Sequence, residues 1–122
     1  MSNPVEQIAA FLEHVAAQVS SLETQANEAI AKQNDEAEYR RLMQQKAELL
    51  AELSATAAPL VNALPPAHKE AVAATIGNFS KSAATSLRIG SVFYMSALLY
   101  PDEHQKGQPN NLELFIKSLG RL

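Results

Sequence analysis

Apolar side chains recur at alternating spacings of four and three residues through the first thirty positions of the chain. They are Ile8, Leu12, Val15, Val19, Leu22, Ala26 and Ala29. This spacing is typical of a coiled-coil-like stripe along one side of a helix. Asn3, Pro4 and Glu6 supply an N-cap, a first-turn proline and the acid of a capping box. We therefore predict a long helix that begins at Pro4.

A second apolar stripe follows a break in the pattern at residues 32–35. Its members are Leu42, Lys46 (through its aliphatic stem), Leu49, Leu53 and Ala57. The two stripes do not share one heptad register, and Asn34 or Asp35 is a suitable N-cap. We expect a helical hairpin over residues 4–58. One continuous helix is the alternative, since residues 32–35 contain neither glycine nor proline.

Prolines at positions 59, 65 and 66 predict that the second helix ends near Ala57 and that a third begins at Pro66. We expect this central helix to span residues 66–100. Its last part, residues 87–100, carries one charge, Arg88, and is shorter than the roughly 20 apolar residues that a bilayer span needs. We therefore expect no membrane span and a segment covered by the two preceding helices. Gly77 and Gly90 predict close helix packing, with a kink as the alternative.

The last part of the chain predicts a polar loop followed by a short helix over residues 110–120. Asn110 and Glu113 have capping-box spacing, and Gly120 is placed as a C-terminal cap. The whole pattern predicts an all-α helical bundle in a single domain, residues 1–122. It has a long N-terminal hairpin, a central apolar helix and a short C-terminal helix.

Composition and charge narrow the function classes. The chain has 122 residues, of which 47% are hydrophobic and 19% charged, as in a folded domain. Residues 1–58 carry nine acids and four bases, a net charge of −5, while residues 59–122 carry six bases and four acids, a net of +2. Lysine and arginine form no stripe, so we do not expect nucleic acid as a partner.

Two further absences concern the compartment. The chain has no cysteine, and no basic leader followed by an apolar run precedes the first helix. We expect a cytoplasmic protein.

Few residues suggest chemistry. Asp102, Glu103 and His104 form the one tight group of possible metal ligands, but a bound ion needs three or four convergent ligands. We interpret this group as a solvated loop and expect no metal and no cofactor. His14 and His68 have no partner in the sequence for nucleophilic catalysis, so we expect no catalytic residues and no enzyme.

Three arginines have two interpretations each. Arg40 and Arg41, near the start of the second helix, suit either a phosphate or ion pairs with Glu36 and Glu38. Arg88 either pairs with an acid or extends its head group to the surface.

Two candidate binding surfaces remain. The first, the N-terminal seam (Ile8, Leu12, Val15, Val19 and Leu22), is a candidate self-association surface. The second is a candidate apolar pocket formed by Phe93, Tyr94 and Met95, for which ordinary core packing is the alternative. We therefore expect a non-enzymatic protein–protein interaction module that forms a homodimer or binds another helical protein. The alternative is a small-molecule or regulatory binding protein with an apolar pocket beside the central helix.

Overall fold

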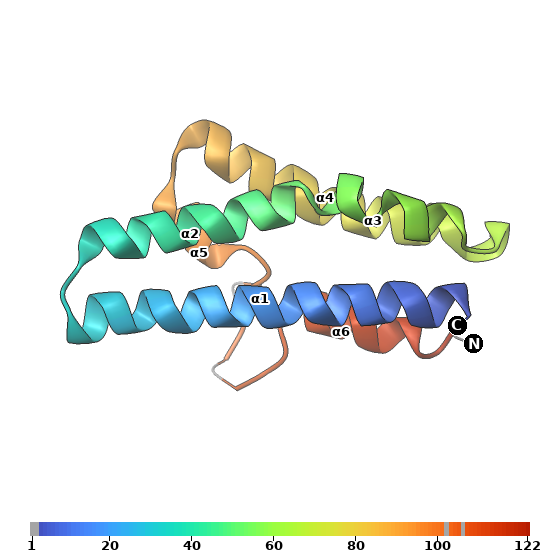
Figure 1. The fold of residues 1–122 in the computed structure, drawn as a ribbon, viewed down its shortest axis with the longest axis horizontal. Coiled ribbons are helices and arrows are strands. Elements are labelled where there is room, and N and C mark those ends of the chain that lie inside the picture. The colour runs from blue at the N-terminus through green and yellow to red at the C-terminus, as the bar shows by residue number, and fades with distance from the viewer. Residues whose placement is uncertain (1–2, 102, 106) are drawn as a thin grey trace.

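A computed structural model describes residues 3–101, 103–105 and 107–122. Those residues form helices and no strands (Figure 1). The elements are α1 (Pro4–Lys32), α2 (Glu36–Ala51), α3 (Leu53–Asn62), α4 (Pro66–Ile89), α5 (Val92–Ala97) and α6 (Asn111–Leu119). The predicted all-α bundle is confirmed.

The N-terminal hairpin is formed by α1 and α2, which run antiparallel side by side (Figure 1). Asn3 caps α1 by accepting the Glu6 N–H at 2.8 Å. In the turn, Asn34 takes a left-handed φ of 51°, which asparagine tolerates better than most residues. Asp35 then caps α2 by accepting the Glu38 N–H at 3.0 Å. The hairpin prediction with its turn at residues 32–35 is therefore confirmed.

The second arm of the hairpin is interrupted at Glu52, where α2 gives way to α3. In an unbroken helix the Ser54 N–H would bond to the Leu50 carbonyl oxygen. Instead the Ser80 hydroxyl of α4 lies between them: it accepts the Ser54 N–H at 2.9 Å and donates to the Leu50 carbonyl at 2.9 Å. This inserted hydroxyl fixes the break and ties α4 to both helices.

The predicted end of this arm near Ala57 is wrong, because α3 continues through Pro59 to Asn62. A proline inside a helix removes one backbone hydrogen bond. Burial of Leu53, Ala57 and Val61 along the inner face of α3 offsets that loss.

The N-terminal seam lies inside the chain's own core. Ile8, Leu12, Val15 and Val19 are buried, and Leu22 is partly buried against the same core. Helix α6 packs on the N-terminal half of α1, and α4 packs on α2 and α3 (Figure 1). Coiled-coil-like spacing therefore serves packing within one chain.

The predicted continuous helix over residues 66–100 is wrong, since the chain turns sharply between α4 and α5. Gly90 has a φ of 74°, a left-handed conformation that glycine adopts without a steric penalty. The Ser91 N–H bonds to the Ser86 carbonyl and the Gly90 N–H to the Leu87 carbonyl, which is a Schellman motif. Ser91 then caps α5 by accepting the Tyr94 N–H at 3.1 Å.

Close helix packing does not explain Gly77 or Gly90. A Cβ built at either position would have no heavy atom within 4 Å beyond its immediate surroundings. Gly90 is explained by its positive φ, and nothing in the structure explains Gly77.

The expectation that other helices bury residues 87–100 along their whole length is also wrong. Met95, Leu98 and Leu99 are buried, but Ile89, Phe93 and Tyr94 face solvent. Within this segment α5 packs against α2 and α4 but not against α1, so one side of it is left uncovered.

The short C-terminal helix is confirmed, and its capping box forms: Asn110 accepts the Glu113 N–H at 2.9 Å, and Glu113 accepts the Asn110 N–H at 3.0 Å. Leu112 and Leu119 are buried on its inner face. Gly120 is the C-cap residue, but with an ordinary helical φ of −65°.

None of the helices in the described part of the chain combines the length and apolar character that crossing a bilayer requires.

We predict that Ser80→Ala lowers the free energy of unfolding by about 1–3 kcal/mol, because it leaves the Ser54 N–H and the Leu50 carbonyl without their partner. Urea denaturation followed by circular dichroism measures this. The matched control is Ser82→Ala, at an exposed position of the same helix. Equal stability of the two variants would mean that α2 and α3 simply join into one helix.

Candidate functional site

A charged side chain lies at the centre of the bundle. Lys46 of α2 has an exposed fraction of 0%, ammonium group included. Its Nζ donates to Glu23 Oε2 of α1 at 2.9 Å and to the Ser96 carbonyl oxygen of α5 at 3.1 Å. A buried charge is tolerated only when it is paired in this way. Lys46 therefore joins three helices.

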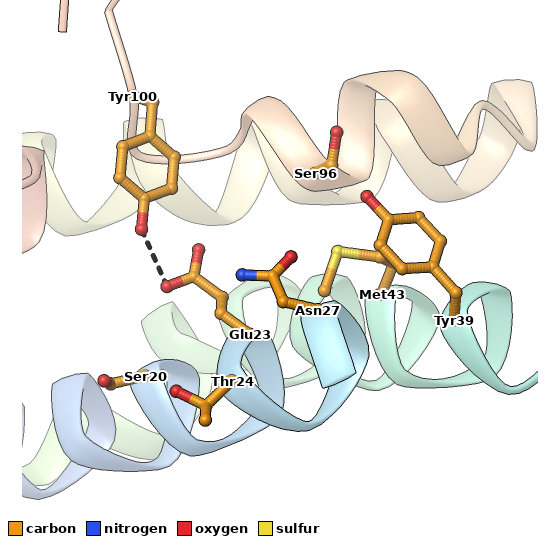
Figure 2. A pocket seen from close by; sticks show the side chains of 8 residues that line it. All are labelled: Ser20, Glu23, Thr24, Asn27, Tyr39, Met43, Ser96 and Tyr100. Atoms are coloured by element: carbon orange, nitrogen blue, oxygen red, sulfur yellow. Dashed lines mark hydrogen bonds between the residues drawn. The ribbon is translucent and has the colours of Figure 1, made fainter. Parts of the chain in front are cut away.

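Tyr100, just beyond α5, completes the network. Its hydroxyl donates to Glu23 Oε1 at 2.7 Å (Figure 2), so one carboxylate binds both the phenol and the ammonium. The Lys46 Nζ also lies 5.1 Å from the centre of the Tyr100 ring, within cation–π range. The Glu23 side chain keeps 19% of its surface exposed. The network thus meets solvent on the Glu23 side.

Burial shifts two pKa values in the network. Desolvation lowers the pKa of Lys46, and the ion pair with Glu23 opposes that shift without cancelling it. Desolvation also raises the pKa of Tyr100 well above its usual 10.0, and the hydrogen bond to Glu23 acts in the same direction. The phenol therefore keeps its proton throughout the neutral range.

A cleft of about 430 Å³ opens beside this network. We call it the polar cleft, and its lining residues are Ser20, Glu23, Thr24, Asn27, Tyr39, Met43, Ser96 and Tyr100. The four from α1 lie on one face of that helix. Figure 2 shows Glu23 and Asn27 between Tyr100 on one side and Tyr39 on the other. The cleft therefore combines polar groups from α1 with two aromatic rings.

The predicted apolar pocket of Phe93, Tyr94 and Met95 does not form as a unit. Met95 is in the core, while Phe93 points outward with 75% of its surface exposed. Consecutive residues of a helix point about 100° apart, so three in a row do not line one cavity. Tyr94 borders a cleft that it shares with Ile89 and Leu98.

The exposed residues at the turn between α4 and α5 form a second surface, the apolar corner: Ile89, Phe93 and Tyr94. Their exposed fractions are 57%, 75% and 53%. The Phe93 and Tyr94 rings stack edge to face with centroids 5.8 Å apart, and Ile89 and Tyr94 share the rim of a cleft of about 600 Å³. Lys81 borders this cleft too.

The remaining candidates show ordinary structural roles. Asp102 lies outside the described residues. His104 has its Nε2 2.8 Å from the Gln108 carbonyl oxygen and its ring against Tyr100. Across residues 3–101, 103–105 and 107–122 no three histidine, aspartate or glutamate side chains gather where they could hold a metal ion.

The arginines and the other two histidines lie at or near the surface, and one of them forms an ion pair within its own helix. Arg41 pairs with Glu38 one turn away, with Nη2 2.9 Å from Oε2, which lowers the pKa of Glu38. Arg40 and Arg88 are exposed. His14 is exposed and His68 is partly buried in the first turn of α4.

Sequence reasoning missed the network and the polar cleft. One signal was present: Lys46 occupies an apolar stripe, where a charge needs a partner. The identity of that partner was hidden, because Glu23 and Tyr100 are 23 and 54 residues away in the sequence. Comparisons with protein-family models, curated proteins and solved structures give no match for this chain.

We predict that Glu23→Gln destabilises the protein more than Lys46→Met does. Removing the acid leaves a fully buried ammonium without a counter-charge, at a cost of roughly 3–5 kcal/mol. Removing the lysine leaves a carboxylate that still reaches water and still accepts from Tyr100. Chemical denaturation of both variants measures the difference. The reverse order would show that Glu23, not Lys46, bears the larger desolvation cost.

The raised pKa of Tyr100 predicts a loss of stability at alkaline pH. The folded protein holds this proton more tightly than the unfolded chain, so the stabilisation is complete below about pH 10 and is lost as the pH rises through the folded value. The phenolate absorbance of the wild type and of Tyr100→Phe is recorded against pH, and the difference between the two curves reports Tyr100. We expect this difference to appear above pH 10. Circular dichroism at each pH monitors folding. A difference curve centred at the ordinary tyrosine value would contradict the assignment.

Proposed function

We propose that this protein is a non-enzymatic helical interaction module that acts in the cytoplasm and self-associates by covering its apolar corner with a second copy. The observation that carries the proposal is the exposure of Phe93, Tyr94 and Ile89 together at one turn. Contiguous apolar patches of this kind on a folded domain mark interaction sites. Aromatic residues in particular contribute much of the binding energy at interfaces.

The surface used for association differs from the one that the sequence suggested. The N-terminal seam is occupied by the core of the same chain. Exposing it to a partner would require unfolding the hairpin. The apolar corner needs no rearrangement, because its side chains already face solvent.

The distribution of charge supports a second copy of the chain as the partner that covers the apolar corner. The exposed charges next to the corner are basic: Lys81 borders its cleft and Arg88 precedes Ile89. The N-terminal hairpin carries the acid excess, and residues 1–58 have a net charge of −5. The hairpin turn and the apolar corner lie toward the same end of the molecule (Figure 1). A two-fold pairing through that end would bring Lys81 and Arg88 of one copy toward acids such as Asp35 and Glu36 at the hairpin turn of the other.

The non-enzymatic part of the proposal is supported by the state of the ionisable network. The Glu23 carboxylate and the Lys46 ammonium are engaged with each other, and Tyr100 is held by the same carboxylate. The Lys46 ammonium is also fully covered, so it is out of reach of a substrate. The lack of cysteine fits a reducing compartment.

Sedimentation velocity over a range of concentrations tests the proposal. We expect the wild-type chain of 13.2 kDa to form a dimer. Phe93→Ser should weaken that dimer by about tenfold or more, as loss of an interface anchor does. Arg88→Glu should weaken it most at low ionic strength.

Leu114→Ser is the matched control, since Leu114 is an exposed apolar residue on α6 that does not line the cleft at the corner. It should leave the dimer intact. A wild-type chain that stays monomeric at every concentration would refute self-association, and the corner would then be assigned to a different protein. Equal weakening by Leu114→Ser and Phe93→Ser would refute this choice of surface.

A further inference from the structure

We infer that the polar cleft between α1, α2 and α5 binds a small neutral ligand that carries several hydroxyl groups, of about the size of one monosaccharide. The cleft volume of about 430 Å³ lies in the range of small-molecule sites. The inference concerns a different surface from the apolar corner and does not depend on self-association.

The polar side chains on the α1 face of the cleft suit a ligand with many hydroxyl groups. Ser20 and Thr24 offer hydroxyls and Asn27 an amide, so each both donates and accepts hydrogen bonds. Tyr39 of α2 adds a further hydroxyl, which lies on the Ser96 side of the cleft (Figure 2). Within the described part of the chain no hydrogen bond engages these four side chains. They remain free to bond to a ligand.

The charges at the cleft favour a neutral ligand. The Glu23 carboxylate is already balanced by Lys46 at 2.9 Å, so a cationic ligand gains little from it. An anionic ligand would approach the exposed edge of that carboxylate, while the Lys46 ammonium is covered and out of reach. The remaining lone pairs of Glu23 can still accept hydrogen bonds from neutral hydroxyls.

The apolar surfaces in the cleft suit the C–H faces of a ring. The rings of Tyr39 and Tyr100 and the thioether of Met43 lie among the polar groups. Tyr100 is held in place by its hydrogen bond to Glu23 and by Lys46 beside its ring. A side chain that is already fixed loses little conformational entropy when a ligand binds.

A set of related probes tests the inference by ¹H–¹⁵N correlation spectroscopy of the whole chain. Glucose, galactose, mannose and myo-inositol are the neutral probes, and glucosamine and gluconate are the cationic and anionic comparators. We expect at least one neutral probe to give saturable shifts of backbone amides in residues 20–27 and 39–43. The comparators should bind more weakly. Absence of saturable shifts with every neutral probe would refute the inference, as would equal binding of a comparator.

Substitutions then locate the binding. Asn27→Ala should weaken the best neutral probe by about three- to tenfold, the value of one or two hydrogen bonds. Gln25→Ala is the control, because Gln25 is exposed on α1 and lies outside the cleft. Both positions are exposed, so both variants should fold, which circular dichroism checks. Unchanged binding by Asn27→Ala would overturn the assignment to this cleft.

A repeat of the titration on Phe93→Ser separates the two proposals. We expect this variant to bind the probe as the wild type does, even if its self-association is lost. Loss of binding in Phe93→Ser with an unaltered cleft spectrum would place the ligand at the apolar corner and refute the inference.

Discussion

The buried ammonium of Lys46 is the constraint on which the arrangement of this bundle depends. A charge without water must be matched by nearby acceptors, and here they come from Glu23 of α1 and the Ser96 carbonyl of α5. Among the described residues every buried side-chain nitrogen and oxygen has a hydrogen-bond partner. Apolar packing alone tolerates sliding of one helix along another. The directional bonds of Lys46 and Tyr100 select one position for α5 relative to the hairpin.

The position of α5 in turn creates both candidate surfaces. Because Glu23 and Lys46 hold Tyr100 against the hairpin, its ring forms one wall of the polar cleft. Because Gly90 turns the chain at the other end of the same segment, the outer side chains of α5 are left without a covering helix. A segment that would be buried as one straight helix therefore presents an aromatic surface to solvent. The proposed self-association and the proposed ligand site share this structural origin.

Much of the architecture was readable from local patterns. Several correctly predicted features belong to short segments: the apolar stripe from Ile8 to Leu22, the Asn3 and Asn110 caps, and the break at residues 32–35. Short-range backbone energetics decide such features. The sequence pattern predicts too late an end for α4, because it does not distinguish Gly90 from an interior helix residue. A glycine is compatible with both a helical and a left-handed conformation, and the packing of the next segment decides between them. Pro59 does not end α3 for a related reason, because the burial of that helix outweighs one lost backbone hydrogen bond.

The sequence by itself determined that this chain is an all-α bundle with an N-terminal hairpin, because helix periodicity and capping act over a few residues. Only the tertiary structure decided that the N-terminal seam is internal, that Lys46 pairs with Glu23 and Tyr100, and that Phe93 faces solvent. These outcomes depend on contacts between residues distant in sequence. The chain covers some apolar stripes and leaves others exposed. The choice depends on how the side chains of all the helices pack together, through their volumes and charges.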